Sequence, residues 1–514
     1  MALRDLCPRR GTKGVKLRTF APLIVLVLAG CTVGPNYKRP AVSAPPNFRA
    51  PDPLPPAQAE SFADMKWFEV FQDPQLQKLI RTALEHNYDL RDAVARVEEA
   101  RADLGITRSN QFPNFGASGA VDINRLSRNG ATPIPVASLA SQNRNFGAAA
   151  LQLLSFEVDI WGRLRRATEA ARANLLGADE NRKAVVTTLV SDVATAYFTL
   201  RELDYTLQIS RRTLNTREQS LELTKSRQSG GVATLLDLRQ SEQLVLTADE
   251  TIPTISQQIE QTENQIALLL GEAPHQIDRG RELTEQKLPP EVPAGLPSAL
   301  LERRPDIRAA EQALVAANAE IGVARAAYFP QISLSGSLGG QSTQLSSLFS
   351  GPSSAWSLIP QVTQPIFTAG RLKSNVRLAQ AERDRALIQY EKTIQTAFTE
   401  VSNALIAHQR VRESRMKQEQ LVVVLQDRLR LAYVRYRGGV DTQLNALDAD
   451  RDLLSAELTL EQVRYAELVS VVQLYKALGG GWQGDGCEWT SVLCAQRSRC
   501  GAGRGRWKPP RSRC

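Results

Sequence analysis

An internal duplication is the feature that most constrains what this chain can fold into. A shift of 217 residues aligns the Phe-Pro pair at 112–113 with the pair at 329–330. A shift of 208 residues aligns the Gly-Gly-Val triplet at 230–232 with the triplet at 438–440. The two shifts differ by nine residues, so one loop is longer in the first copy. Self-similarity of this kind is typical of chains that repeat one structural unit, and it predicts two internal repeats.

Each copy contains two short segments in which apolar residues alternate with small or polar residues. The apolar members are Phe115, Ala117, Val121, Ile123, Leu151, Leu153, Ile332, Leu334, Leu338, Trp356, Leu358 and Val362. A period of two predicts β-strands, and the polar loops at 125–144 and 341–354 predict one hairpin per copy. Strands of ~9–11 residues with one apolar face match the wall of a transmembrane barrel. The alternative is a soluble hairpin that caps a helical bundle.

Four strands per chain are too few to close a barrel. An open sheet edge cannot lie in lipid, because its backbone groups would have no hydrogen-bond partner. Several chains must therefore contribute strands. Three copies would supply twelve strands, the smallest cyclic assembly that leaves a usable lumen, which predicts a homotrimer.

Long helices are predicted for most of the remaining sequence. Apolar residues recur every seven positions at Val186, Val193, Leu200, Leu207, Leu214 and Leu221, a spacing typical of a coiled-coil seam. The predicted helices are 75–110, 163–229 and 232–270 in the first copy and 297–328, 371–437 and 440–478 in the second. The fold class is therefore mixed, with a long helical coiled-coil barrel and a twelve-stranded transmembrane β-barrel that a trimer closes.

The front of the chain resembles a bacterial lipoprotein signal. A basic stretch precedes an apolar run at 20–30, which is too short for a transmembrane helix but suits a signal peptide. The run ends in Leu-Ala-Gly before Cys31, which resembles a lipobox and makes Cys31 the predicted lipidation site. Thr32 follows in place of an acidic residue, which in such signals indicates the outer membrane. The alternative is an ordinary secretory signal with a coincidental cysteine.

Composition argues against several other functions. Residues 31–482 carry a net charge of −1, so the basic character of the whole chain does not indicate nucleic-acid binding. No cysteine lies between positions 32 and 486, and the three histidines are far apart. No nucleophile elbow, zinc-protease motif or phosphate-binding loop is present, so we predict no enzyme activity, catalytic residue, metal site or cofactor.

Several motifs together resemble the TolC-like outer-membrane efflux family, of the OprM/NodT lipoprotein type. The matching segments are 31–37 with Pro40, 67–76 (WFEVFQDPQL), 303–307 (RRPDI) and 436–440 (YRGGV) with 447–448. The resemblance covers roughly 31–482. It implies a trimeric barrel in the outer membrane, anchored by lipid and extending into the periplasm as a twelve-helix tunnel. It also implies the exit duct of a tripartite pump, with a periplasmic adaptor and an inner-membrane transporter of the RND type, and small-molecule drugs as the first substrates to consider.

The resemblance also implies site residues near the two helix turns. The periplasmic gate would contain Leu444, Asp448 and Arg451, with Asp237 near the equivalent turn of the first copy. Three copies of Asp448 would form an acidic ring that favours cations. The candidates for adaptor contact are Gly231, Val232, Gly438, Gly439 and Val440. The alternatives are solvated charges on a helix face and simple helix capping.

The predicted domain organisation follows these segments. It comprises a signal peptide (1–30), an extended lipid-anchored segment (31–66), a first repeat (67–271), an equatorial linker (272–296), a second repeat (297–482) and a tail (483–514). The tail holds four cysteines and seven basic residues without apolar periodicity, which indicates a disordered product of a frameshift. Two other functions stay open, namely the duct of a type I protein-secretion system and a non-conducting periplasmic coiled-coil scaffold.

Overall fold

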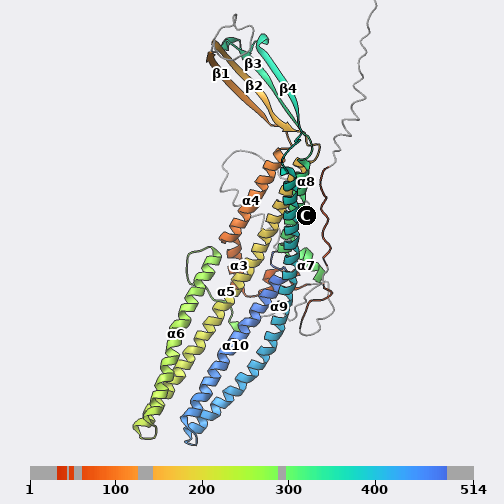
Figure 1. The fold of residues 1–514 in the computed structure, drawn as a ribbon. Helices are drawn as coiled ribbons and strands as arrows, with labels where there is room; N and C mark the ends of the chain where they lie inside the picture. Colours follow the sequence, from red (N-terminus) through yellow and green to blue (C-terminus); the bar gives the residue numbers. More distant parts are fainter. Residues whose placement is uncertain (1–31, 43–44, 51–60, 126–142, 287–296, 483–514) are drawn as a thin grey trace, which may run out of the picture. The chain divides into compact units, whose positions relative to one another are not determined.

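A computed structural model describes residues 32–42, 45–50, 61–125, 143–286 and 297–482 (Figure 1). The chain divides into two compact units. Unit 1 contains Glu99–Leu175, Gln312–Ile388 and the chain up to Pro40, and unit 2 contains Ala41–Glu98, Leu176–Glu311 and the chain from Gln389. Each unit therefore draws on both sequence repeats. The predicted signal peptide, Cys31 and the tail lie outside the described residues.

Unit 1 contains one antiparallel sheet of four strands in the order β1-β2-β3-β4 (Figure 1). The strands are β1 (Phe115–Arg125), β2 (Asn143–Glu157), β3 (Gln331–Ser342) and β4 (Ser354–Thr363). Both predicted hairpins are confirmed, one in each repeat. The register between β2 and β3 shifts between Leu153 and Phe156. Such an irregularity bends and twists the strand locally, as a curved sheet requires.

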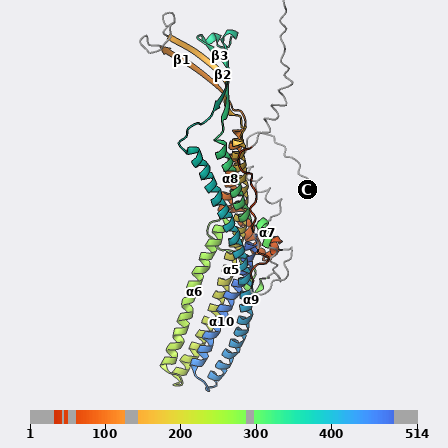
Figure 2. The ribbon, with the colours of Figure 1, turned by 45° about the vertical axis from the view of Figure 1, so that its right-hand side comes forward.

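The long helices of the two repeats have the predicted bounds. They are α5 (Arg163–Ser229) and α9 (Arg371–Arg437), and α6 (Leu235–Leu270) and α10 (Gln443–Ala477) return along them. In unit 2, α5 with α6 and α9 with α10 form two antiparallel hairpins that lie side by side in both views (Figures 1 and 2). Among the helices that the structure describes, none is both long enough and apolar enough to cross a bilayer.

Each shorter predicted helix is divided in two, which corrects the predicted stretches 75–110 and 297–328. The observed helices are α3 (Pro74–His86), α4 (Tyr88–Ser109), α7 (Pro297–Arg303) and α8 (Pro305–Ala326), with a short α2 (Trp67–Val70) before them. Asn87 ends α3, and its side chain donates to the carbonyl of Leu269 and accepts from the amide of Leu90. In the second copy, Pro305 disfavours helical geometry at the preceding residue.

The predicted coiled-coil seam of α5 is correct only in its first half. Val186, Val193 and Leu200 are fully buried, whereas Leu207, Leu214 and Leu221 are half-buried. Beyond Ser210 the buried positions of α5 are polar, namely Thr213, Arg217 and Thr224. Arg217 and Thr224 make hydrogen bonds to neighbouring helices, which offset the cost of removing these two side chains from water.

A buried carboxylate organises the core of unit 2. Asp73 caps α3 and accepts hydrogen bonds from the Tyr197 hydroxyl (2.8 Å), the Arg281 amide (3.0 Å) and the Gln286 side chain (2.8 Å). Burial raises the pKa of Asp73, but the hydrogen bonds from Gln286, Tyr197 and the backbone outweigh burial and leave it below its ordinary value. The carboxylate is therefore ionised at neutral pH and fixes three segments to one point.

Gly280→Ala should destabilise unit 2 by about 1–3 kcal/mol, because overpacking forces neighbouring side chains to move. A Cβ at Gly280 would lie 2.5 Å from the Tyr197 hydroxyl and in contact with the Asp73 carboxylate. Gly105→Ala is the control, because that Cβ would meet nothing within 4 Å. Thermal unfolding of both variants in detergent checks this, and equal melting temperatures would contradict the close packing at Gly280.

Candidate functional site

The sheet has one apolar face, and the strand register defines it. Ala117 pairs with Leu151, Leu151 with Leu338, and Leu338 with Trp356, so these four side chains form one row. The other residues of this face that the register identifies are Phe115, Val121, Ile123, Leu153, Ile332, Leu334, Leu358 and Val362. Large side chains of this face are exposed within the chain, Trp356 by 76%. The alternation predicted from sequence is confirmed, and this face requires an apolar environment.

The opposite face is mostly small and polar, with Ile359 as a large apolar exception. The Gln152 side chain donates to the Ser118 hydroxyl (2.9 Å), and the Ser337 and Ser357 hydroxyls share a hydrogen bond (2.8 Å). Ser333, Ser335, Gln361 and Thr363 also lie on this face. The sheet is therefore amphipathic, with one face suited to lipid and one suited to water.

Both edges of the sheet are open within the described chain. In the sheet order, β1 pairs only with β2, and β4 pairs only with β3. The outer backbone groups of β1 and β4 therefore need another partner.

The described residues nearest to the predicted lipidation site pack against the rest of unit 1. The Val33 amide donates to the carbonyl of Trp161 (3.0 Å), and the Arg166 guanidinium donates to the Asn36 side chain (2.7 Å). Gly34, at φ +106°, lies so close to Gly322 that a Cβ would be 2.5 Å from the Gly322 Cα atom. This N-terminal strap (residues 32–37) is therefore fixed where β2 passes into α5.

Aromatic side chains mark the same junction between the sheet and the helices. The rings of Trp161 and Phe329 are stacked with centroids 4.6 Å apart. The Trp161 indole N–H donates to the carbonyl of Pro330 (2.9 Å). Tryptophan with an apolar ring and one satisfied polar atom is the residue type enriched at membrane–water interfaces.

The two helix turns of unit 2 have the same geometry. Gly231 (φ +71°) and Gly439 (φ +73°) adopt the left-handed conformation that ends a helix. The Val232 amide donates to the carbonyl of Arg227 (2.8 Å) and the Val440 amide to that of Arg435 (3.1 Å). Gly230 and Gly438, the first glycines of the repeated Gly-Gly-Val triplets, directly precede these left-handed residues.

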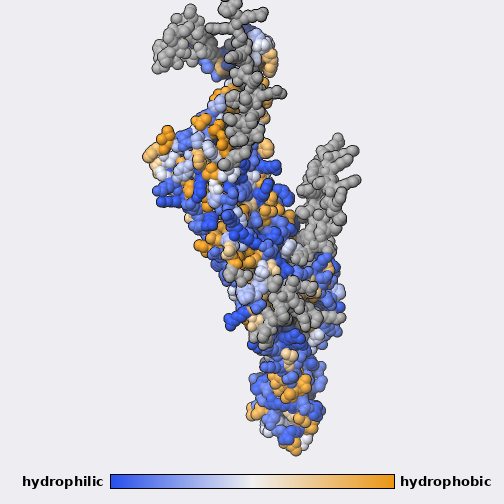
Figure 3. Space-filling model, turned by 90° about the vertical axis from the view of Figure 1, so that its right-hand side faces the viewer, coloured by the Kyte–Doolittle hydropathy of each residue, from blue (hydrophilic) through white to orange (hydrophobic). Residues whose placement is uncertain are grey.

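Exposed apolar side chains surround these turns and form what we call the tip patch. Its members are Val232, Leu235, Leu236, Val440 and Leu444. Val232 is 79% exposed and Val440 69% exposed. Figure 3 shows apolar surface among hydrophilic atoms at the lower end of the view, where the two turns lie. Capping explains the glycines, but it does not require these exposed apolar neighbours.

Asp448 and Arg451, two of the predicted gate residues, belong to a group of four charges on α9 and α10 that we call the tip charge cluster. Asp448 pairs with Arg451 (2.5 Å) and with Arg428 of α9 (3.3 Å), and Arg428 also pairs with Asp452 (2.6 Å). The hydrogen bond from Arg428 holds the pKa of Asp452 below its ordinary value. Sequence reasoning missed Arg428 and Asp452, although a comparison of the two repeats would have marked them as charges found only in the second.

Asp237, another predicted gate residue, is not part of the tip charge cluster and lies at the start of α6. It accepts hydrogen bonds from the amide (2.8 Å) and the hydroxyl (2.7 Å) of Thr234 at the start of α6. This is a capping box, so its carboxylate has a local structural partner. The remaining predicted gate residue, Leu444, is exposed near the start of α10 and belongs to the tip patch.

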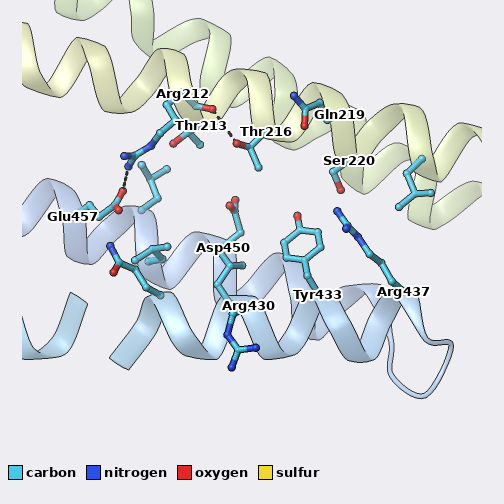
Figure 4. Close-up of a pocket in the computed structure, with 15 residues that line it drawn as sticks. Arg212, Thr213, Thr216, Gln219, Ser220, Arg430, Tyr433, Arg437, Asp450 and Glu457 are labelled. Carbon is cyan, nitrogen blue, oxygen red and sulfur yellow. Dashed lines mark hydrogen bonds and ion pairs between the residues drawn. The ribbon is translucent and has the colours of Figure 1, made fainter. Parts of the chain in front are cut away.

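A polar cavity of about 480 Å³ separates α5 from α9 and α10 in unit 2 (Figure 4). The Asp450 carboxylate and the Tyr433 hydroxyl point into it, and Arg212 forms an ion pair with Glu457 at one end. Asp450 also pairs with Arg217 (3.1 Å), and their side chains are only 10% and 7% exposed. Burial raises the pKa of Tyr433, so its hydroxyl stays protonated and can donate. The two hairpins are therefore joined here by buried polar contacts.

Within the described residues, no three histidine, cysteine, aspartate or glutamate side chains are placed to hold a metal ion. The structural features that stand out are instead the amphipathic sheet, the docked strap and the helix turns. These features are suited to a wall and an opening.

Comparison with known proteins identifies the family. A family model described as "Outer membrane efflux protein" matches residues 79–272 and 296–480. The antibiotic efflux pump outer membrane protein ArpC of Pseudomonas putida is 39% identical over 459 residues, which cover 89% of this chain and 94% of ArpC. The cation efflux system protein CusC of Escherichia coli is 35% identical over 461 residues, covering 90% of this chain and 98% of CusC.

A solved structure agrees with these sequence matches. The crystal structure of the open state of the MtrE outer membrane channel of Neisseria gonorrhoeae superposes with a TM-score of 0.80 at 34% identity, covering 88% of this chain and 99% of MtrE. The predicted fold class, with long helices, four strands per chain and two repeated halves, is confirmed by this likeness. The chain therefore belongs to the outer membrane efflux protein family, as the motifs indicated, and is an outer membrane efflux channel rather than an enzyme.

Proposed function

We propose that three copies of this chain close a twelve-stranded barrel and form the passive exit duct of a tripartite pump for small toxic molecules. The observation that carries this proposal is an amphipathic sheet with two open edges. Pairing β4 of one copy with β1 of the next would satisfy both edges and leave no exposed backbone in lipid. The apolar face would then contact lipid and the hydroxyl-rich face would line water.

The docked strap supports a lipid anchor at Cys31. Thr32 follows Cys31 directly and packs against Gly162, where a Cβ would lie 2.8 Å from the Thr32 methyl group. The chain next to the proposed anchor is thus held at the sheet–helix junction, where Trp161 and Phe329 lie. A second hydrophobic attachment at this level would fix the depth of the barrel in the membrane.

The tip patch supports a periplasmic partner. Exposed apolar side chains on a rigid turn are suited to docking against another protein, and the patch includes Val232 and Val440, two of the predicted contact residues. We assign this surface, with Gly231, Gly438 and Gly439 as its turn-forming residues, to a periplasmic adaptor. The energy for transport would come from the RND-type inner-membrane transporter that the adaptor joins to the duct.

The tip charge cluster supports a gate in the same region. Asp448 links α10 to α9 through Arg428, so the pairing opposes separation of these helices. Ion pairs between exposed groups are individually weak, which suits a contact that must open and reclose.

Asp448→Ala should raise the single-channel conductance by about twofold or more, because the charged groups that narrow an entrance control ion flow through it. The measurement compares the lipidated variant with the wild type in planar bilayers. Asp427→Ala is the control, since Asp427 pairs with Arg430 on its own helix. An unchanged conductance in Asp448→Ala would move the gate away from this residue, and silent trimers of both the wild type and the variant would contradict the duct itself.

A further inference from the structure

We infer that Arg428 sets the ionic selectivity of the periplasmic entrance by neutralising Asp448 and Asp452. The inference rests on the proposed function, because it concerns charges at an entrance through which ions pass. This inference differs from the prediction that three copies of Asp448 alone form an acidic ring, because it assigns the net charge of the entrance to Arg428 as well.

The contacts place Arg428 between the two carboxylates. Its guanidinium donates to Asp452 through Nη1 (2.6 Å) and to Asp448 through Nη2 (3.3 Å). Arg428 comes from α9 and both aspartates from α10, so one planar side chain bridges the two helices of the hairpin. A guanidinium can bridge two carboxylates, because its N–H donors point in different directions within one rigid plane.

The charges in the tip charge cluster balance. Arg451 donates to Asp448 (2.5 Å) and lies 3.6 Å from Asp452, so two arginines face two aspartates. Among the other charges near this turn, Arg435 pairs with Asp441 (3.0 Å) and Arg430 with Asp427 (2.8 Å), whereas Arg437 lies over the Tyr433 ring. The negative charge of Asp448 is therefore neutralised by two arginines. Arg451 lies on the same helix, α10, and Arg428 is the arginine that comes from the facing helix, α9.

The duplication shows that this balance is specific to the second hairpin. With the shift of 208 residues, the counterparts of the four charges are Ser220, Gln240, Gln243 and Leu244. None of these counterparts is charged, although the turns themselves have the same geometry. The four charges are thus not needed to build a helical hairpin of this kind, which points to a role at the entrance.

The test is the reversal potential of single channels in a salt gradient, measured for the wild type, Arg428→Ala and Arg428→Lys. Removing the cation should raise the cation-to-anion permeability ratio by about threefold, since the uncovered carboxylates attract cations. Arg428→Lys keeps the charge and should retain the wild-type ratio. Arg430→Ala removes an arginine two residues away that contacts neither Asp448 nor Asp452, and it should also leave the ratio unchanged.

A second variant keeps the inference testable if Arg428→Ala does not assemble. Asp448→Asn with Asp452→Asn leaves both arginines uncompensated and should shift the ratio toward anions. Conducting channels whose ratio is the same in the wild type, Arg428→Ala and the double variant would overturn the inference while leaving the duct intact. Folded trimers that do not conduct in the wild type, in Arg428→Ala or in the double variant would instead overturn the proposed function.

Discussion

Leu358→Arg should prevent assembly of the barrel in the membrane, whereas Ser357→Arg should be tolerated. Leu358 lies near the middle of β4 on the apolar face and is 59% exposed within the chain. An arginine in contact with lipid near the bilayer midplane costs about 2–4 kcal/mol per chain, and a trimer would bear this cost three times. Ser357 is the adjacent residue and lies on the opposite face, beside Ser337.

The two variants can be compared by the amount of trimer in outer-membrane fractions, measured as a band on unheated gels that disappears on heating. We expect wild-type amounts for Ser357→Arg and little or no trimer for Leu358→Arg. If both variants assemble equally well, the apolar face does not contact lipid. If only Ser357→Arg fails, the two faces are assigned in reverse.

Asp450→Ala should destabilise the helical hairpins by about 3–5 kcal/mol, because it leaves the Arg217 guanidinium buried without its counter-charge. Arg217 donates to Asp450 (3.1 Å) and to the carbonyl of Leu244 (3.2 Å), so α5 is joined to both α10 and α6 at this point. Replacing both partners, as Arg217→Met with Asp450→Leu, should recover most of the lost stability, since no unpaired charge then remains.

Chemical unfolding in detergent, followed by helical circular dichroism, measures this difference. Asp427→Ala serves as the control, because the exposed pair of Asp427 with Arg430 should contribute only about 0–1 kcal/mol. An Asp450→Ala variant as stable as the control would show that the pair is dispensable for joining the hairpins.

The parts of the fold that could be predicted from sequence depend on local or repeated patterns. The strand faces follow from a period of two, so Leu338 and Ser337 could be assigned to opposite faces without a structure. The ends of the long helices follow from the glycine pairs, and α5 and α9 end as predicted at Ser229 and Arg437. The duplication then strengthened each prediction, because the same pattern occurs twice.

The features that could not be predicted depend on contacts between distant segments. The seven-residue spacing placed Leu214 and Leu221 in the seam, but the buried face there is built around Arg217, whose partner lies on a helix 233 residues away in sequence. The neutralisation of Asp448 by Arg428 likewise requires knowing how α9 and α10 align. The docking of Gly34 on Gly322 depends on a close backbone approach between segments that lie far apart in sequence.

We propose that this chain forms a water-filled pore by closing its sheet with other copies of itself. The most direct test is the conductance of purified wild-type trimers, lipidated at Cys31, in a planar bilayer. We predict discrete current steps whose size scales with bulk salt conductivity, as expected for a lumen lined by water. Folded trimers that insert into the bilayer and carry no current under any applied voltage, in the wild type and in Asp448→Ala alike, would contradict this proposal.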